Sequence, residues 1–295
     1  EGCDRVCSFC SIPLIRGPHK SISAEKLIAE AESLVSEGVK ELILVAQDTT
    51  YYGVDLYKRR EITSLMSKIA DIKGLEWLRL HYSYPAGFPE DLLELMASHP
   101  KICKYLDIPL QHISDSVLGA MRRNIDGNET RRIVAKFRDK VPGIALRTTM
   151  IVGHPGEDKK AFDELLGFIK EIRFERLGAC PYSQEEGTFG AANLKDTISE
   201  KIKQERYEKL MEVQSGISLE YNLQRVGTVD RVLIDSFDNG VYTARSQKES
   251  PEVDGEILIG HFKGENELQP NNIIGTFAQV KIENADEYDL MARFI

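Results

Sequence analysis

Three cysteines close to the start of the chain form the clearest chemical motif in the sequence. Cys3, Cys7 and Cys10 follow the spacing Cys-x3-Cys-x2-Cys on a segment rich in small and polar residues. Thiolates this close together in sequence can converge on one metal centre. A four-iron cluster has four ligand positions, so three protein thiolates leave one iron open to a cofactor or a substrate. The motif therefore predicts a [4Fe-4S] cluster with one open iron.

A structural zinc ion is the alternative occupant of these cysteines, with His19 as a possible fourth ligand. Structural zinc usually binds paired Cys-x2-Cys knuckles, and the sequence contains no second pair. The spacing therefore favours the cluster. Under the zinc alternative, the protein would be a zinc-stabilised RNA- or ribosome-binding module without catalysis.

The overall composition predicts a globular protein of the cytoplasm. The chain has 295 residues, 42% of them hydrophobic, enough for one large domain with a small one beside it. Its five cysteines, an odd number, do not suggest a disulfide framework and indicate a reducing compartment. Cys103 and Cys180 fall in predicted strands, where we expect small buried hydrophobic residues. No apolar run approaches the roughly 20 residues that cross a bilayer, so we expect no membrane partner.

The net charge of -9 argues against a protein that binds mainly by neutralising phosphates. The charge is concentrated near the C-terminus. Residues Val226–Ile295 contain 13 acidic and 6 basic side chains, whereas Glu1–Arg225 contain 34 and 32. The C-terminal segment is therefore predicted to attract basic partners.

Strand-like and helix-like segments alternate along the first half of the chain, which predicts an α/β fold with a parallel sheet. The sequence begins at Glu1, just before the cysteines, so we expect a preceding N-terminal part that includes a sixth strand. The whole would then be a partial (β/α)6 barrel. The five strands predicted within this chain are Leu42–Ala46, Glu76–His81, Tyr105–Ile108, Ala145–Val152 and Arg176–Cys180.

The end of the chain has a different pattern. A long helix is predicted from about Ser199 to Gln224, and β-branched runs with turn signals such as Asp238-Asn239-Gly240 follow it. We expect residues 1–225 to form the first domain with its linker helix. Residues 226–295 should form a small antiparallel β-barrel that recognises the substrate.

With the aromatic Phe9 directly before the third cysteine, the motif resembles the signature of radical S-adenosylmethionine (SAM) enzymes. The resemblance implies the partial (β/α)6 barrel. It also implies that the open iron binds the amino and carboxylate groups of SAM. One electron, which needs an external electron donor, then cleaves SAM into methionine and a 5′-deoxyadenosyl radical.

Barrel enzymes carry their sites at the carboxyl ends of strands, so polar groups at those ends are candidates for holding SAM. Glycines in the turn after the fourth strand would allow the backbone to approach the adenosine closely. The candidates, besides Phe9, are Gln47, Asp48, Gln111, Arg147, Gly153 and Glu157.

Further motifs resemble those of the methylthiotransferase family over essentially the whole chain, and the final segment resembles its TRAM domain. His154 departs from the pattern, because the family commonly has Phe there. The matching motifs are Ser8–Pro13, Arg16-Gly17, Pro109–Gln111, Met121-Arg122-Arg123 and Val152–Glu157.

One branch of that family modifies tRNA adenosine, and another modifies an aspartate of ribosomal protein S twelve. The segments Gln47–Thr50 and Asp107–His112 resemble the protein-modifying branch. An acidic C-terminal barrel would also repel tRNA and attract a basic ribosomal protein, so tRNA is the less favoured substrate. The resemblance implies hydrogen abstraction at the aspartate β-carbon, sulfur insertion, and methylation from a second SAM.

The family carries a second [4Fe-4S] cluster on three cysteines of an N-terminal domain. The present sequence has no such additional set. We therefore expect this chain to cleave SAM without completing methylthiolation by itself.

Overall fold

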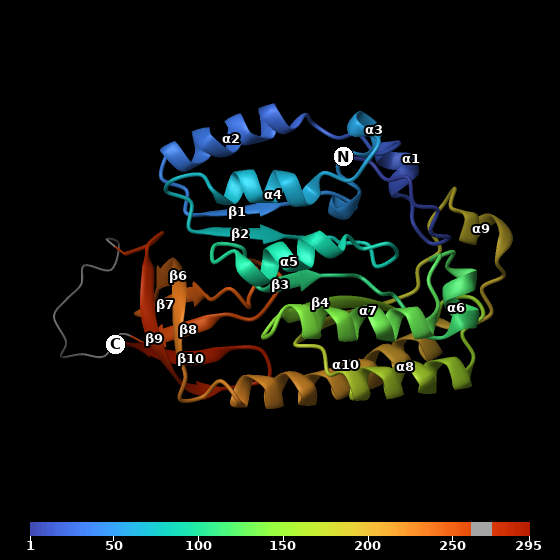
Figure 1. The fold of residues 1–295 in the computed structure, drawn as a ribbon. Coiled ribbons are helices and arrows are strands. Elements are labelled where there is room, and N and C mark those ends of the chain that lie inside the picture. The colour runs from blue at the N-terminus through green and yellow to red at the C-terminus, as the bar shows by residue number, and fades with distance from the viewer. Residues whose placement is uncertain (261–272) are drawn as a thin grey trace.

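A computed structural model describes residues 1–260 and 273–295 of the chain. Figure 1 shows a layer of parallel strands covered by helices, with a small β-barrel at one end. Residues 261–272, which belong to the segment predicted as a β-barrel, lie outside the described residues.

Five short parallel strands form the open barrel predicted from the sequence. They fall into a two-stranded and a three-stranded sheet, and the pairing Leu78↔Ile102 bridges the two. The expected sixth strand is not among the described residues. Because all pairs are parallel, the carboxyl ends of the strands meet at one edge. The strands are β1 (Glu41–Leu44), β2 (Trp77–Leu80), β3 (Tyr105–Asp107), β4 (Ala145–Val152) and β5 (Arg176–Pro181).

The helices pack on the outer face of these strands (Figure 1). In α8 (Lys159–Ile172), Asp158 caps the first turn by accepting a hydrogen bond from the Ala161 amide, and Leu165 and Ile169 are fully buried one turn apart. Full burial of such a side chain stabilises the fold by about 2 kcal/mol. The other helical segments are α1 (Ile12–Arg16), α2 (Ala24–Ser36), the 3-10 turn η1 (Thr49–Tyr51), α3 (Val54–Tyr57), α4 (Ile62–Ala70), α5 (Glu90–Ser98), α6 (Asp115–Ala120), α7 (Gly127–Lys140), α9 (Phe189–Asn193) and α10 (Glu200–Leu223).

The C-terminal segment folds as a closed barrel whose five described strands have the order β10-β8-β7-β6-β9. Asn239 and Gly240, both with positive φ, form the predicted two-residue turn between β6 and β7. These strands are β6 (Val229–Asp238), β7 (Val241–Arg245), β8 (Ile257–Gly260), β9 (Phe277–Ala285) and β10 (Leu290–Phe294).

The predicted small antiparallel barrel is present, with one parallel pair, β8 and β10. The other neighbouring pairs are antiparallel. Strand directions cannot alternate all the way around a closed ring with an odd number of strands. The ring of five described strands therefore requires at least one parallel pair.

The small barrel docks on the amino-terminal end of the parallel strands (Figure 1). The rings of Trp77 in β2 and Phe277 in β9 make an edge contact with centroids 4.7 Å apart. Glu41 at the start of β1 pairs with Arg245 of β7 at 2.8 Å. The carboxyl edge of the strands is thus left free for a site at the opposite end.

Among the described residues, no helix combines the length and the apolar character that a membrane crossing requires.

Candidate active site

The cysteine loop lies over the carboxyl edge of the parallel strands and is held there by backbone hydrogen bonds. The Ser8 amide donates to the carbonyl of Met121 at 2.9 Å, and the Ser8 carbonyl accepts from the Gly190 amide at 2.6 Å. The Cys3 amide donates to the Gly17 carbonyl at 3.1 Å. The loop is therefore fixed by segments distant in sequence, although it has no regular secondary structure of its own.

Cys3, Cys7 and Cys10 all line one pocket of about 520 Å³. This volume is in the range of pockets that enclose a small-molecule cofactor. Its remaining walls come from the ends of β1, β2 and β3, from the middle of β4, and from the turn after α6. The other lining residues are Arg5, Phe9, Ile12, Val45, Ala46, Gln47, Tyr82, Ser83, Tyr84, Pro109, Gln111, Arg123 and Thr149.

The described residues around the thiols do not supply a ready fourth ligand for a single zinc ion. Two sulfurs bound to one zinc ion lie at most about 4.6 Å apart, because each Zn–S bond is about 2.3 Å. Within residues 1–260 and 273–295, no three His, Cys, Asp or Glu side chains are grouped tightly enough for one ion. His19 does not line the pocket, since its ring bonds to Ser21 at 3.1 Å. Three cysteines on one pocket can instead supply three of the four ligands of a four-iron cluster.

Burial raises the pKa of both the Cys3 and Cys10 thiols above their ordinary value. The Arg5 amide, which donates to the Cys3 sulfur at 3.4 Å, and the Arg123 cation near Cys10 act in the opposite direction. Metal ligation requires the thiolates, so metal uptake here would release protons and strengthen as pH rises.

Arg5 is held over the pocket by an acid and an aromatic ring. Its guanidinium pairs with Asp48 at 2.8 Å and lies 3.9 Å from the ring centroid of Tyr84. Asp48 is buried and also accepts a hydrogen bond from Thr50 at 2.6 Å. Asp48 itself does not line the pocket, so its role there is to position Arg5.

Phe9, Gln47 and Gln111 do line the pocket, as expected for contacts to a cofactor. Gln111 has the left-handed φ of 74°, and its amide and carbonyl are tied to Thr149 and Ile151 of β4 at 2.9 and 2.8 Å. Its buried Oε1 has no hydrogen-bond partner among the described residues. This oxygen can therefore accept a hydrogen bond from a ligand in the pocket.

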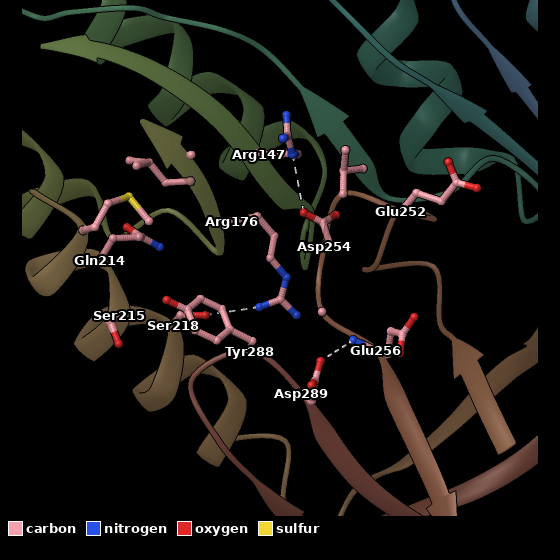
Figure 2. A pocket seen from close by; sticks show the side chains of 15 residues that line it. Arg147, Arg176, Gln214, Ser215, Ser218, Glu252, Asp254, Glu256, Tyr288 and Asp289 are labelled. Atoms are coloured by element: carbon pink, nitrogen blue, oxygen red, sulfur yellow. Dashed lines mark hydrogen bonds and ion pairs between the residues drawn. The ribbon is translucent and has the colours of Figure 1, made fainter. Parts of the chain in front are cut away.

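Arg147 lies elsewhere, in a second pocket of about 430 Å³ between β5, α10 and the small barrel. Figure 2 shows Arg147 with Arg176 and Asp254 in this pocket, and Arg147 pairs with Asp254 at 3.5 Å and with Asp107 at 3.0 Å. Alternate strand residues share a face, so Arg147 and Thr149 point the same way from β4. Thr149, nearer the carboxyl end, reaches the cysteine pocket, whereas Arg147 does not.

Gly153 and Glu157 form a structural turn behind the pocket. The Gly153 amide donates to Glu157 Oε2 at 2.8 Å, and Glu157 Oε1 pairs with Arg206 of α10 at 2.7 Å. A β-carbon on Gly153, whose φ is 75°, would lie 2.4 Å from Lys203 Cγ. The glycine at this position is thus required by helix packing, and neither residue lines the cysteine pocket.

His154 supports the cysteine loop as a neutral ring. Burial lowers its pKa to about 4. Its Nδ1 lies 3.0 Å from the Pro155 carbonyl, which can only accept, so Nδ1 carries the proton and Nε2 accepts from the Ser8 hydroxyl at 3.2 Å. The ring therefore links the turn after β4 to the cysteine loop.

Several lining residues were not predicted as site residues from the sequence. Tyr82, Ser83 and Tyr84 follow β2 directly, so the rule of strand carboxyl ends would have found them. Thr149 lies inside a strand, and Arg123 lies in a turn after α6, where the Met121-Arg122-Arg123 motif resembled the family pattern but did not indicate a place in the pocket. The expectation for Cys103 is confirmed, but Cys180 is exposed because β5 is the edge strand of its sheet.

The open barrel of parallel strands, with three cysteines over its carboxyl edge, defines a radical SAM domain. The family model described as "Radical SAM superfamily" matches residues 1–169, and the model described as "TRAM domain" matches residues 226–295. Both assignments agree with the architecture in Figure 1.

Relatives with close sequence similarity narrow the assignment. The chain is 48% identical to the ribosomal protein uS12 methylthiotransferase RimO of Bacteroides fragilis and 50% identical to that of Phocaeicola vulgatus. Each match covers 100% of this chain and 67% of the relative. The chain thus belongs to the ribosomal protein uS12 methylthiotransferase family of radical SAM enzymes, and it spans about two thirds of the length of these members.

Solved structures of lower identity share the fold. The coproporphyrinogen III oxidase HemN from Escherichia coli, described as a radical SAM enzyme, matches with a TM-score of 0.55 and 16% identity over 84% of this chain and 65% of that chain. The radical SAM methyltransferase TsrM from Kitasatospora setae matches with a TM-score of 0.53 and 16% identity, over 82% and 40% of the respective chains.

Proposed function

We propose that this chain is the catalytic portion of an enzyme that adds a methylthio group to the β-carbon of an aspartate in ribosomal protein uS12. The observation that carries the proposal is the convergence of Cys3, Cys7 and Cys10 in one pocket of about 520 Å³. The identity of about half the residues to uS12 methylthiotransferases supports the choice of substrate.

The pocket residues fit a [4Fe-4S] cluster and SAM. Cys3, Cys7 and Cys10 would hold three irons, and Phe9 and Gln111 offer an aromatic ring and a free amide oxygen to SAM. When bound, the cluster and SAM together supply a 5′-deoxyadenosyl radical after one-electron reduction by an external donor. The residues of the chain would bind the cluster and SAM, orient SAM toward the substrate, and exclude water from the pocket.

The other predicted contacts would act in different ways. Gln47 lines the pocket and would bind SAM directly, whereas Asp48 would act by positioning Arg5. Gly153 and Glu157 would shape the turn behind the pocket. Arg147 lines the second pocket and not the cysteine pocket, so on this proposal it would act away from SAM.

We propose that sulfur delivery needs a part of the enzyme beyond this chain. This chain covers 67% of the length of one such relative. We expect the second [4Fe-4S] cluster to lie in an N-terminal domain outside this chain. On this proposal, the present chain cleaves SAM but does not complete methylthiolation alone.

The small barrel has a surface suited to a basic protein. Asp238, Glu252 and Glu287 are exposed acids for which no ion pair with a basic side chain is found in the described structure. By contrast, the exposed Arg231 and Arg293 are neutralised by Glu76 and Glu283. This negative surface would attract a basic ribosomal protein and repel tRNA, and a ribosomal substrate implies a cytoplasmic location.

A substrate exchange tests the proposal. The full-length enzyme, reconstituted anaerobically with SAM and a reductant, would be given either ribosomal protein uS12 or tRNA. We expect the mass of one methylthio group on a uS12 aspartate and none on the tRNA. Modified tRNA adenosine with unmodified uS12 would contradict the proposal and assign the tRNA branch instead.

A further inference from the structure

We propose that Arg123 is the counter-charge of the iron–sulfur cluster and raises the reduction potential of that cluster. The proposal rests on the proposed function, because it assumes that Cys3, Cys7 and Cys10 hold a cluster. It assigns to Arg123 a tuning role that no sequence pattern indicated.

Arg123 is a buried cation without an acid. Its side chain is 3% exposed, yet it forms no ion pair with any Asp or Glu in the described part of the chain. Its Nη1 lies 3.5 Å from the sulfur of Cys7, its Nη2 donates to the Pro109 carbonyl, and its buried Nε has no hydrogen-bond partner among the residues that the structure describes. The Cys7 sulfur is therefore the group through which a bound cluster would face this guanidinium.

The neighbouring Arg5 lines the same pocket but, unlike Arg123, forms an ion pair with an acid. Tyr84 lies between the two arginines, with its ring centroid 3.9 Å from the Arg5 guanidinium and 4.4 Å from that of Arg123. Arg5 pairs with Asp48 at 2.8 Å, but no carboxylate of residues 1–260 or 273–295 pairs with Arg123. The pocket therefore holds one uncompensated positive charge beside the cysteines.

The turn that carries Arg123 is strained and fixed to the cysteine loop. Arg122, directly before Arg123, has a φ of 57°, a left-handed conformation unfavourable for arginine, and Asn124, directly after it, has a φ of 53°, which asparagine tolerates. The Met121 carbonyl in the same turn accepts from the Ser8 amide at 2.9 Å. The Tyr84 hydroxyl donates to the Arg123 carbonyl. These contacts hold the guanidinium at Cys7 despite the strained backbone.

Electrostatics then gives the direction of the effect. A buried charge is unfavourable unless an opposite charge compensates it. A cluster on three thiolates is anionic and gains one more negative charge when it accepts an electron. A fixed cation at a ligand sulfur stabilises that reduced form more than the oxidised form, and hydrogen bonds and charge near the sulfurs are known determinants of cluster potentials.

The test is a redox titration of the SAM-free cluster in the anaerobically reconstituted chain. We expect Arg123→Gln to lower the equilibrium constant for reduction at least tenfold, which is a shift of about 59 mV to more negative potential. Arg123→Lys, which keeps the cation, should stay within that tenfold range. The matched control Arg122→Gln changes the adjacent, exposed arginine and should leave the potential unchanged.

Three outcomes would overturn the inference. The first is an unchanged potential in Arg123→Gln with weaker SAM binding, which would make Arg123 a SAM ligand. The second is an equal fall in Arg123→Lys, which would show that charge is not responsible. If Arg123→Gln fails to retain the cluster, Arg123→Lys decides by itself, because loss of the cluster there as well would indicate a structural role. Failure of the parent chain to take up any cluster would instead refute the proposed function.

Discussion

Arg176 of strand β5 and Glu249 of the small barrel form an ion pair of 3.2 Å in which both side chains are almost completely buried. Arg225, at the end of the linker helix, pairs with the same carboxylate. The acid thus joins the radical SAM domain, the helix and the TRAM domain at one point.

Glu249→Gln should destabilise the chain strongly, because it leaves buried cations without their counter-charge. At neutral pH we expect a loss of about 3 kcal/mol or more in the free energy of unfolding, measured by urea titration. The control Glu220→Gln removes the exposed partner of Arg173 and should cost less than about 1 kcal/mol. Equal costs would show that the buried pair does not hold the domains together.

The contribution of Glu249 to stability should also depend on pH. Burial alone would raise the pKa of Glu249, but Arg225 and Arg176 outweigh it and lower the pKa from 4.5 to about 2. Because the folded pKa is the lower one, the carboxylate stabilises the folded chain above about pH 4.5 and loses this effect toward pH 2. The stability difference between the parent and Glu249→Gln should therefore shrink over that window. A constant difference would contradict the assignment.

His154 gives a second pH window. Its pKa falls from 6.5 to about 4 because the ring is buried. As pH drops below 6.5, His154 becomes protonated in the unfolded chain but stays neutral in the folded chain. Stability therefore declines down to about pH 4. In His154→Phe, whose ring cannot be protonated, we expect the free energy of unfolding to fall less over this pH range, by up to about 3 kcal/mol. Ser8→Ala, which keeps the ring, should retain the decline, and identical pH profiles for all three proteins would refute a buried neutral histidine.

Gly2 is required for the cysteine loop to close. A β-carbon at Gly2, whose φ is 76°, would lie 2.1 Å from the Pro18 carbonyl oxygen. Gly2→Ala should therefore lower the iron content after reconstitution, with a backbone cost of about 1–2 kcal/mol. Gly216→Ala, in α10 with open space around it, should raise stability by about 0.5–1 kcal/mol and leave iron content unchanged. Normal iron in Gly2→Ala would show that the loop tolerates displacement.

Gln111 should contact SAM through its free amide oxygen. Gln111→Asn keeps the amide and tolerates the left-handed backbone but withdraws the oxygen by one methylene. We expect the affinity for SAM, measured by equilibrium binding, to fall up to about tenfold. This is the effect expected from losing one hydrogen bond. Gln204→Asn on the exposed face of α10 should bind like the parent. Equal affinity in both variants would remove Gln111 from the site.

The sequence predicted the features that depend on local spacing. The cysteine triplet, the positions of the five strands along the chain and the linker helix are all local patterns, and each lies where it was expected. Gln47 and Gln111, chosen because they follow the carboxyl ends of strands, both line the cysteine pocket, and their contact with SAM stays a prediction.

Features that depend on three-dimensional packing were not predictable. Arg147 lies on the correct face of β4, but too near its amino end to reach the cysteines. Arg123 became buried because a strained turn folds onto the cysteine loop, and no periodicity encodes that contact. The parallel pair of β8 and β10 follows from closure of an odd-numbered ring, which is visible only once the strands are counted.

The central claim is that the three cysteines support radical SAM chemistry, and the most direct test is the formation of 5′-deoxyadenosine. The chain, reconstituted anaerobically with iron and sulfide, would be incubated with SAM and a strong reductant. We predict the nucleoside with the parent chain and its loss when Cys3, Cys7 and Cys10 are changed to Ala. A parent chain that binds no cluster and forms no nucleoside would contradict the claim and favour the zinc-stabilised binding module.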